Sequence, residues 1–131
     1  MQADYTLREV VTLRADLEAV HTFFLSHDWT QGTFAKNRCG DDIEPRSAFA
    51  CSWCLTGAVL RLIDDEQRAD ALYRYLAAHL DGYNYNPPSR DTHPMFALQD
   101  FNDRACAEQN HLLSFLSSAY TKSAQLLEGT D

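Results

Sequence analysis

The sequence contains no apolar run long enough to cross a lipid bilayer, which takes about 20 residues as a helix. Its longest run, Cys54 to Ile63, is interrupted by Thr56, Gly57 and Arg61. The first residues have neither the basic start nor the apolar stretch of a secretory signal peptide. We therefore expect a soluble, cytoplasmic protein with no membrane partner.

Basic residues are also few, with 11 lysines and arginines against 19 aspartates and glutamates, which gives a formal charge of −8. A field of that sign repels phosphate backbones and anionic lipids, so it disfavours direct binding of nucleic acid. It favours a protein partner with a basic surface. Glycine is scarce as well, and the isolated Gly32 and Gly40 form no phosphate loop or dinucleotide motif.

The chain has a single closely spaced pair of cysteines. A usual zinc site takes its thiolates from two such pairs in turns, whereas the C-x-x-C pair of this chain lies inside an apolar pattern of helical spacing. Its five histidines show no H-x-x-x-H spacing. We expect no metal and no cofactor, and reduced thiols with a structural role. The four cysteines are Cys39, Cys51, Cys54 and Cys106.

What the 131 residues do contain is the apolar periodicity of helices, so we predict one all-α domain over residues 1–131, with about five helices. Thr6 and Glu9 form a capping-box pattern before the first helix, although β-branched residues in 4–14 leave a short N-terminal strand as an alternative. Ser47 is the expected N-cap of the second helix. The predicted helices are Leu7–Ser26, Ala48–Leu62, Asp65–Leu80, Pro94–Phe101 and Ala105–Leu127.

Single residues in and between these helices carry further expectations. Gly57 inside a helix indicates a neighbour too close for a Cβ atom. Trp29 is too large to leave in water, so its loop, residues 27–46, should fold back on the core, with Gln31 holding it shut. Asn102 and Asp103 should end one helix and cap the next.

Three short motifs resemble a known family, the domain of unknown function 6197, which is found in small proteins of bacteria and their phages. The motifs are Trp29-Thr30-Gln31-Gly32, Trp53-Cys54-Leu55-Thr56-Gly57-Ala58 and Phe101-Asn102-Asp103. The resemblance implies a helical fold and a phage or mobile-element setting. It implies no reaction mechanism.

For function, charge, size and this setting favour a non-catalytic protein-binding domain that inhibits a host defence complex, for example an anti-CRISPR protein. Two acidic clusters and one tyrosine-rich loop are the candidate contacts, although these tyrosines could instead cover a helix end. The candidate partner-binding residues are Asp41, Asp42, Glu44, Asp64, Asp65, Glu66, Tyr83, Tyr85 and Arg90.

A cysteine-dependent hydrolase or transferase is the alternative function. Cys54 or Cys51 would be the nucleophile, because a thiolate is stabilised near a helix N-terminus, and His93 or His111 would be the base. Asn102 or Asp103 would orient that base, and Gln31 would donate to an oxyanion.

Overall fold

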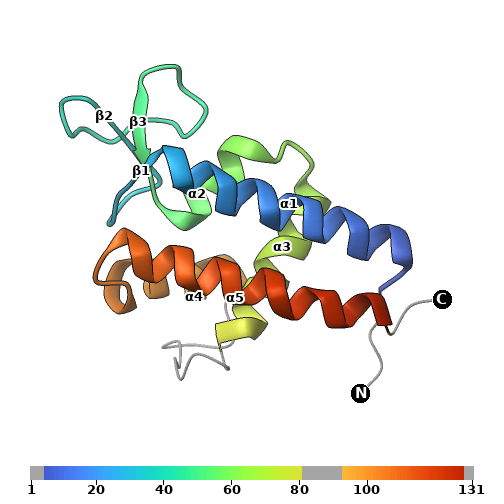
Figure 1. The fold of residues 1–131 in the computed structure, drawn as a ribbon. Coiled ribbons are helices and arrows are strands. Elements are labelled where there is room, and N and C mark those ends of the chain that lie inside the picture. The colour runs from blue at the N-terminus through green and yellow to red at the C-terminus, as the bar shows by residue number, and fades with distance from the viewer. Residues whose placement is uncertain (1–4, 81–92, 129–131) are drawn as a thin grey trace.

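The computed structural model describes residues 5–80 and 93–128. Five α-helices, one π-helical turn and three short strands make up this part of the chain (Figure 1). In chain order they are α1 (Leu7–Ser26), β1 (Asp28–Trp29), β2 (Ala35–Asn37), β3 (Ala50–Trp53), α2 (Leu55–Leu62), α3 (Glu66–His79), α4 (Pro94–Asp100), the π-helix η2 (Phe101–Ala105) and α5 (Gln109–Glu128).

The first helix begins where the capping box places it. The Thr6 hydroxyl accepts from the Glu9 N–H at 3.1 Å, and the Glu9 carboxylate accepts from the Thr6 N–H at 2.8 Å. Two N–H groups that the helix itself leaves unpaired are thereby satisfied. The helix prediction is confirmed, and the alternative of an N-terminal strand is wrong.

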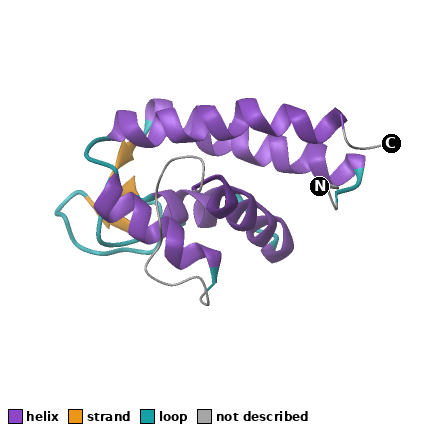
Figure 2. Ribbon diagram, turned by 90° about the horizontal axis from the view of Figure 1, so that it is seen from below, coloured by secondary structure: helices purple, strands orange, loops and turns teal. Residues whose placement is uncertain are grey.

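Two long helices form one layer of the molecule, and the shorter helices pack beneath them. α1 and α5 run antiparallel and side by side, with α2, α3 and α4 on one side of the pair (Figure 2). The buried Asp16 of α1 pairs with Arg68 of α3, whose Nε lies 3.1 Å from Oδ2. None of the described helices combines the length and the apolar character that a membrane span requires.

A small sheet occupies the end where α1 stops and α5 starts (Figure 1). The strand order is β1-β3-β2, with β1 parallel and β2 antiparallel to β3. The fold is therefore mostly helical but not all-α. The prediction of a helix from Ala48 is wrong for residues 48–53, because β3 comes first and α2 starts only at Leu55.

The error has a local cause at Phe49, an apolar residue four positions before Trp53 and hence at helical spacing from it. Phe49 is 75% exposed and precedes β3, and Ser47 instead holds a turn through its hydroxyl, which accepts from the Phe49 N–H. Trp53, at the other end of β3, is buried, and its indole N–H donates to the Pro45 carbonyl at 2.9 Å. Helical spacing alone did not separate the exposed ring from the buried one.

Gly57 in α2 confirms the prediction of a close neighbour. A Cβ atom on this residue would lie 1.9 Å from the carbonyl oxygen of Phe34. The same oxygen accepts a hydrogen bond from the Cys54 N–H at 3.1 Å, so the loop is fastened to the start of α2. Trp29, from the same loop, packs against the core as expected.

The end of the chain departs from its prediction in one place. The short helix α4 and the last helix both exist, but α5 begins at Gln109 instead of Ala105. Residues Phe101–Ala105 form the π-helical turn, in which the Cys106 N–H donates to the Phe101 carbonyl at 3.1 Å.

Candidate functional site

The three motifs meet at the side chain of Asn102, which has no exposed surface. Its Oδ1 accepts from the Trp29 indole N–H at 2.6 Å and from the Leu55 backbone N–H at 3.0 Å. Its Nδ2 donates to the Thr30 carbonyl at 3.2 Å and to the Asp103 carboxylate at 2.8 Å. Asn102 therefore ties the 27–46 loop and the start of α2 to the π-helix.

Gln31 closes the same loop from the surface. Its Nε2 lies 3.0 Å from the Asn102 carbonyl, 3.2 Å from that of Asp103 and 3.0 Å from that of Cys106. The predicted role of holding the loop shut is confirmed, although the residue is exposed. The predicted capping role of Asn102 is wrong in its target, because it caps α2 and not the helix that follows it. Both polar atoms of the Asn102 side chain, Oδ1 and Nδ2, therefore have structural partners.

Cys54 lies at the N-cap of α2, not a turn inside a helix as expected. Its Sγ accepts from the Gly57 N–H at 3.2 Å and lies 3.2 Å from the Thr56 hydroxyl. Burial raises the pKa of this thiol, which opposes formation of the nucleophilic thiolate. Cys51 is exposed on β3, and its thiol faces the Phe49 carbonyl at 3.5 Å.

The two histidines proposed as the base form their hydrogen bonds elsewhere. His93 caps α4 through Nδ1, which accepts from the Met95 N–H at 3.1 Å, while its Nε2 lies 2.7 Å from Asp70. Both ring nitrogens are thus engaged, which leaves no lone pair for a general base. His111 Nδ1 accepts from the Ala107 N–H at 3.1 Å, just before α5.

The cysteines do not converge on a metal. Cys39 and Cys51 are exposed, whereas Cys54 and Cys106 are buried. Within residues 5–80 and 93–128, no three histidine, cysteine or carboxylate side chains come close enough to hold a metal ion.

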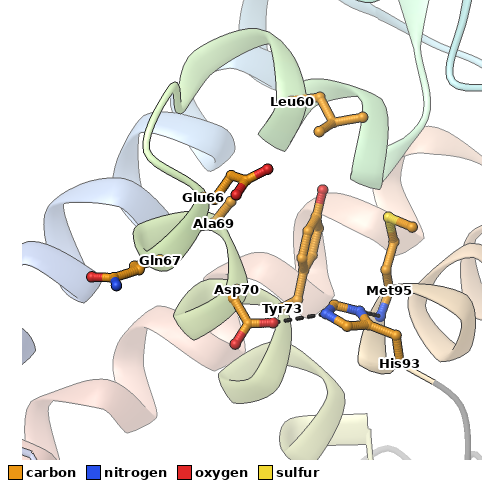
Figure 3. A pocket seen from close by; sticks show the side chains of 8 residues that line it. All are labelled: Leu60, Glu66, Gln67, Ala69, Asp70, Tyr73, His93 and Met95. Atoms are coloured by element: carbon orange, nitrogen blue, oxygen red, sulfur yellow. Dashed lines mark hydrogen bonds and ion pairs between the residues drawn. The ribbon is translucent and has the colours of Figure 1, made fainter.

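The surface between α2, α3 and α4 is hollowed into two adjoining cavities, which we call the acidic groove. One cavity, of about 560 Å³, is lined by the Asp70–His93 pair and by Tyr73 of α3. The Tyr73 ring stands between α2 and α4 (Figure 3). The other, of about 370 Å³, is bounded by the segment 44–46 and the turn after α2. Leu60, Glu66 and Ala69 line both cavities and form the apolar and acidic wall that they share.

Carboxylates dominate the rim of the acidic groove. Glu44, Asp64, Glu66 and Asp70 line it, and Arg46 is the arginine that lines it, 3.4 Å from Asp64. Arg46 also donates to the Leu60 carbonyl at 2.7 Å, so its position is fixed by the end of α2. Hydrogen bonds from Arg74 and His93 hold the pKa of Asp70 below its ordinary value, so this carboxylate is ionised at neutral pH.

The predicted partner-binding residues are thus divided by the structure. Glu44 comes from one acidic cluster and joins Asp64 and Glu66 from the other at the acidic groove. Asp65 instead caps α3, where its Oδ1 accepts from the Gln67 and Arg68 N–H groups.

Asp41 and Asp42 are exposed near the tip of the hairpin that follows β2, where the backbone of Asp42 forms an antiparallel β-bridge with that of Lys36. Neither residue lines the acidic groove. Tyr83, Tyr85 and Arg90 lie outside the described residues.

Sequence reasoning missed the floor of the groove. Leu60 and Ala69 had been assigned to helices, but nothing in their spacing indicated that they would lie between carboxylates. The one available signal was the spacing of Glu66 and Asp70, four residues apart, which places both on one face of a helix.

Comparison with known proteins gives one match. No curated protein and no solved structure matches the chain. The model of a family described as a family of unknown function (DUF6197) matches residues 8–122, which is most of the chain. The chain therefore belongs to this family of unknown function, DUF6197.

Proposed function

We propose that this protein is a non-catalytic binding domain that holds a basic segment of a partner protein in the acidic groove. The proposal rests on one observation: three carboxylates line the same cavity as two apolar side chains. The carboxylates are those of Glu44, Asp64 and Glu66, and the apolar residues are Leu60 and Ala69. These carboxylates come from segments that are about 20 residues apart, so the groove is a product of the fold and not of one acidic run.

The chemistry of the groove supports a basic ligand. The side chains of Glu44 and Glu66 form no hydrogen bond or ion pair with another described residue, so both are available to an incoming cation. The apolar floor adds contact area that a purely electrostatic surface lacks. The overall charge of −8 would speed the approach of a basic partner and make binding sensitive to salt.

No specific observation favours the alternative of a cysteine-dependent hydrolase or transferase. Cys54 serves as a helix cap with a raised pKa, and the hydrogen bonds of His93 and His111 go to Asp70, Met95 and Ala107. These contacts support a structural role for the residues concerned.

The identity of the partner stays a prediction. From the setting that the family resemblance implies, we expect a phage or mobile-element protein whose partner belongs to a host defence complex, such as a CRISPR effector. Identification of the bound protein tests this expectation together with the binding function.

The experiment is affinity capture from bacterial lysates with the tagged full-length chain, followed by mass spectrometry. The groove variant is Glu44→Lys with Glu66→Lys, and the matched control is Glu18→Lys with Glu128→Lys, which makes the same change of charge at exposed positions outside the groove. We expect the wild type and the control to retain one partner at about 0.1 M salt and to lose it near 0.5 M. Equal retention by the groove variant would contradict the proposal.

A further inference from the structure

The outer surface of α1 carries large apolar side chains from its first turn to its last. Leu7 is 48% exposed, Val11 is 55% exposed and Leu25 is 63% exposed. Leu7 and Leu25 are separated by about five complete turns of an α-helix, and Val11 lies one turn after Leu7, so the three side chains share one side of the helix. We call these three residues the α1 face.

α5 provides a comparison within the same molecule, because it lies beside α1 in the same layer and has the same length (Figure 2). Its exposed residues are polar apart from Ala124, as is usual for a helix surface in water. They include Asn110, Ser117, Thr121, Lys122 and Gln125. The α1 face is therefore not a general property of this layer, and an exposed apolar face of this kind marks an interaction surface.

Two charged residues of α1 accompany the α1 face, and neither has a partner of opposite charge. Glu18 is exposed and forms no hydrogen bond or ion pair with another described residue. Arg14 donates to the Ser123 hydroxyl at 2.9 Å and lies over the Tyr120 ring, but it pairs with no carboxylate of the described residues. One anion and one cation are thus open to charges supplied by a second molecule.

We propose that the α1 face binds a second copy of this chain, with the two α1 helices antiparallel about a two-fold axis at the level of Asp16. Such an axis brings together residues that lie equally far before and after Asp16. Leu7 therefore meets Leu25 of the second copy, and Arg14 meets Glu18 of the second copy, each pair occurring twice. A parallel pair would instead place Glu18 against Glu18.

The antiparallel pairing matches apolar and charged groups in one register, because both pairs have Asp16 as their midpoint. Burial of the leucines would supply affinity, whereas the exposed ion pairs would mainly fix the orientation. α1 is about 30 Å long, so the contact is small beside the interface of about 1,200 Å² or more that a specific stable complex buries. We therefore expect a weak dimer with a micromolar Kd. The acidic groove lies between α2, α3 and α4, so this inference does not depend on the proposed function.

The first test is sedimentation velocity of the full-length chain between about 1 µM and 1 mM, which spans the expected Kd. We expect a monomer–dimer equilibrium for the wild type. Leu25→Ser should raise the Kd at least about tenfold, because two-fold symmetry makes each substitution count twice. Phe49→Ser is the matched control, since it removes an exposed apolar side chain at the sheet and should leave the Kd unchanged.

The second test exchanges the charges. Glu18→Arg and Arg14→Glu each place like charges opposite one another, so each variant alone should be monomeric at a concentration where the wild type is dimeric. An equimolar mixture should recover the dimer, because every arginine then faces a glutamate. Circular dichroism checks that each variant is folded, and Leu25→Ser, at an exposed position, keeps the test valid if Arg14→Glu is not.

Three results would overturn the inference. The first is a wild-type chain that stays monomeric up to about 1 mM. The second is a dimer that Leu25→Ser leaves intact or that Phe49→Ser dissociates, since either would place the contact on another surface. The third is a mixture of the two folded charge variants that remains monomeric.

Discussion

Replacing Asn102 by alanine would remove the contact through which the three motifs meet. The substitution leaves the Leu55 N–H and the Trp29 indole N–H without their acceptor, and the Thr30 carbonyl without its donor. Each buried polar group left unpaired costs about 1–3 kcal/mol. Trp29 is only half-buried, so water can satisfy part of its loss. We therefore expect Asn102→Ala to reduce the free energy of unfolding by roughly 3–5 kcal/mol.

Urea denaturation followed by circular dichroism and tryptophan fluorescence measures this loss. For a chain of 131 residues, each 1 kcal/mol lowers Tm by about 4 °C, so a decrease of about 12–20 °C is expected. Asn110→Ala, at an exposed position of α5, is the matched control and should change the stability by less than about 0.5 kcal/mol. A loss below about 1 kcal/mol for Asn102→Ala would refute the reasoning, because it would mean that the network is not needed to fasten the loop.

Two other predictions follow from the start of α2 and from the thiols. Gly57→Ala places a Cβ atom 1.9 Å from the backbone oxygen of Phe34. We expect it to lower the free energy of unfolding, measured by urea denaturation, by about 2 kcal/mol, although alanine has the better helix propensity. Unchanged stability would show that the loop can move aside without cost. The exposed Cys39 and Cys51 should react with a thiol reagent within minutes in the folded protein, whereas the two buried thiols should react only as it unfolds. Rapid labelling of all four thiols in the native state would contradict the burial of the other two.

The helices could be predicted from the sequence where their ends carry local signals. The capping box of Thr6 and Glu9 and the N-cap Asp65 act within a few residues of the helices that they start, so their pattern is visible in the chain. The start of α2 could not be read in this way. A thiol is an unusual cap, and the second group at this terminus, the Asn102 amide, comes from 47 residues away.

The candidate site was predictable in its parts and not in its assembly. The turn after α2 is acidic in the sequence, and so is the segment that contains Glu44. Their meeting depends on Trp53 and Arg61, both of which donate to the Pro45 carbonyl and so hold that segment against α2. Long-range contacts of this kind carry no periodicity that a single sequence displays, and for the same reason Asp41 and Asp42 could not be separated from Glu44 in advance.

The antiparallel pairing of α1 and α5 also has a mechanical consequence. The start of α1 and the end of α5 lie at the same edge of the molecule, while the sheet lies at the opposite edge (Figure 1). A force applied to the two ends of this chain would pull the helices apart across their shared face, and the Arg14 contacts with Tyr120 and Ser123 would break early. α1 and α5 would separate one helical turn at a time, starting from these ends. The 27–46 loop, which Asn102 fastens at the opposite edge, would unfold last.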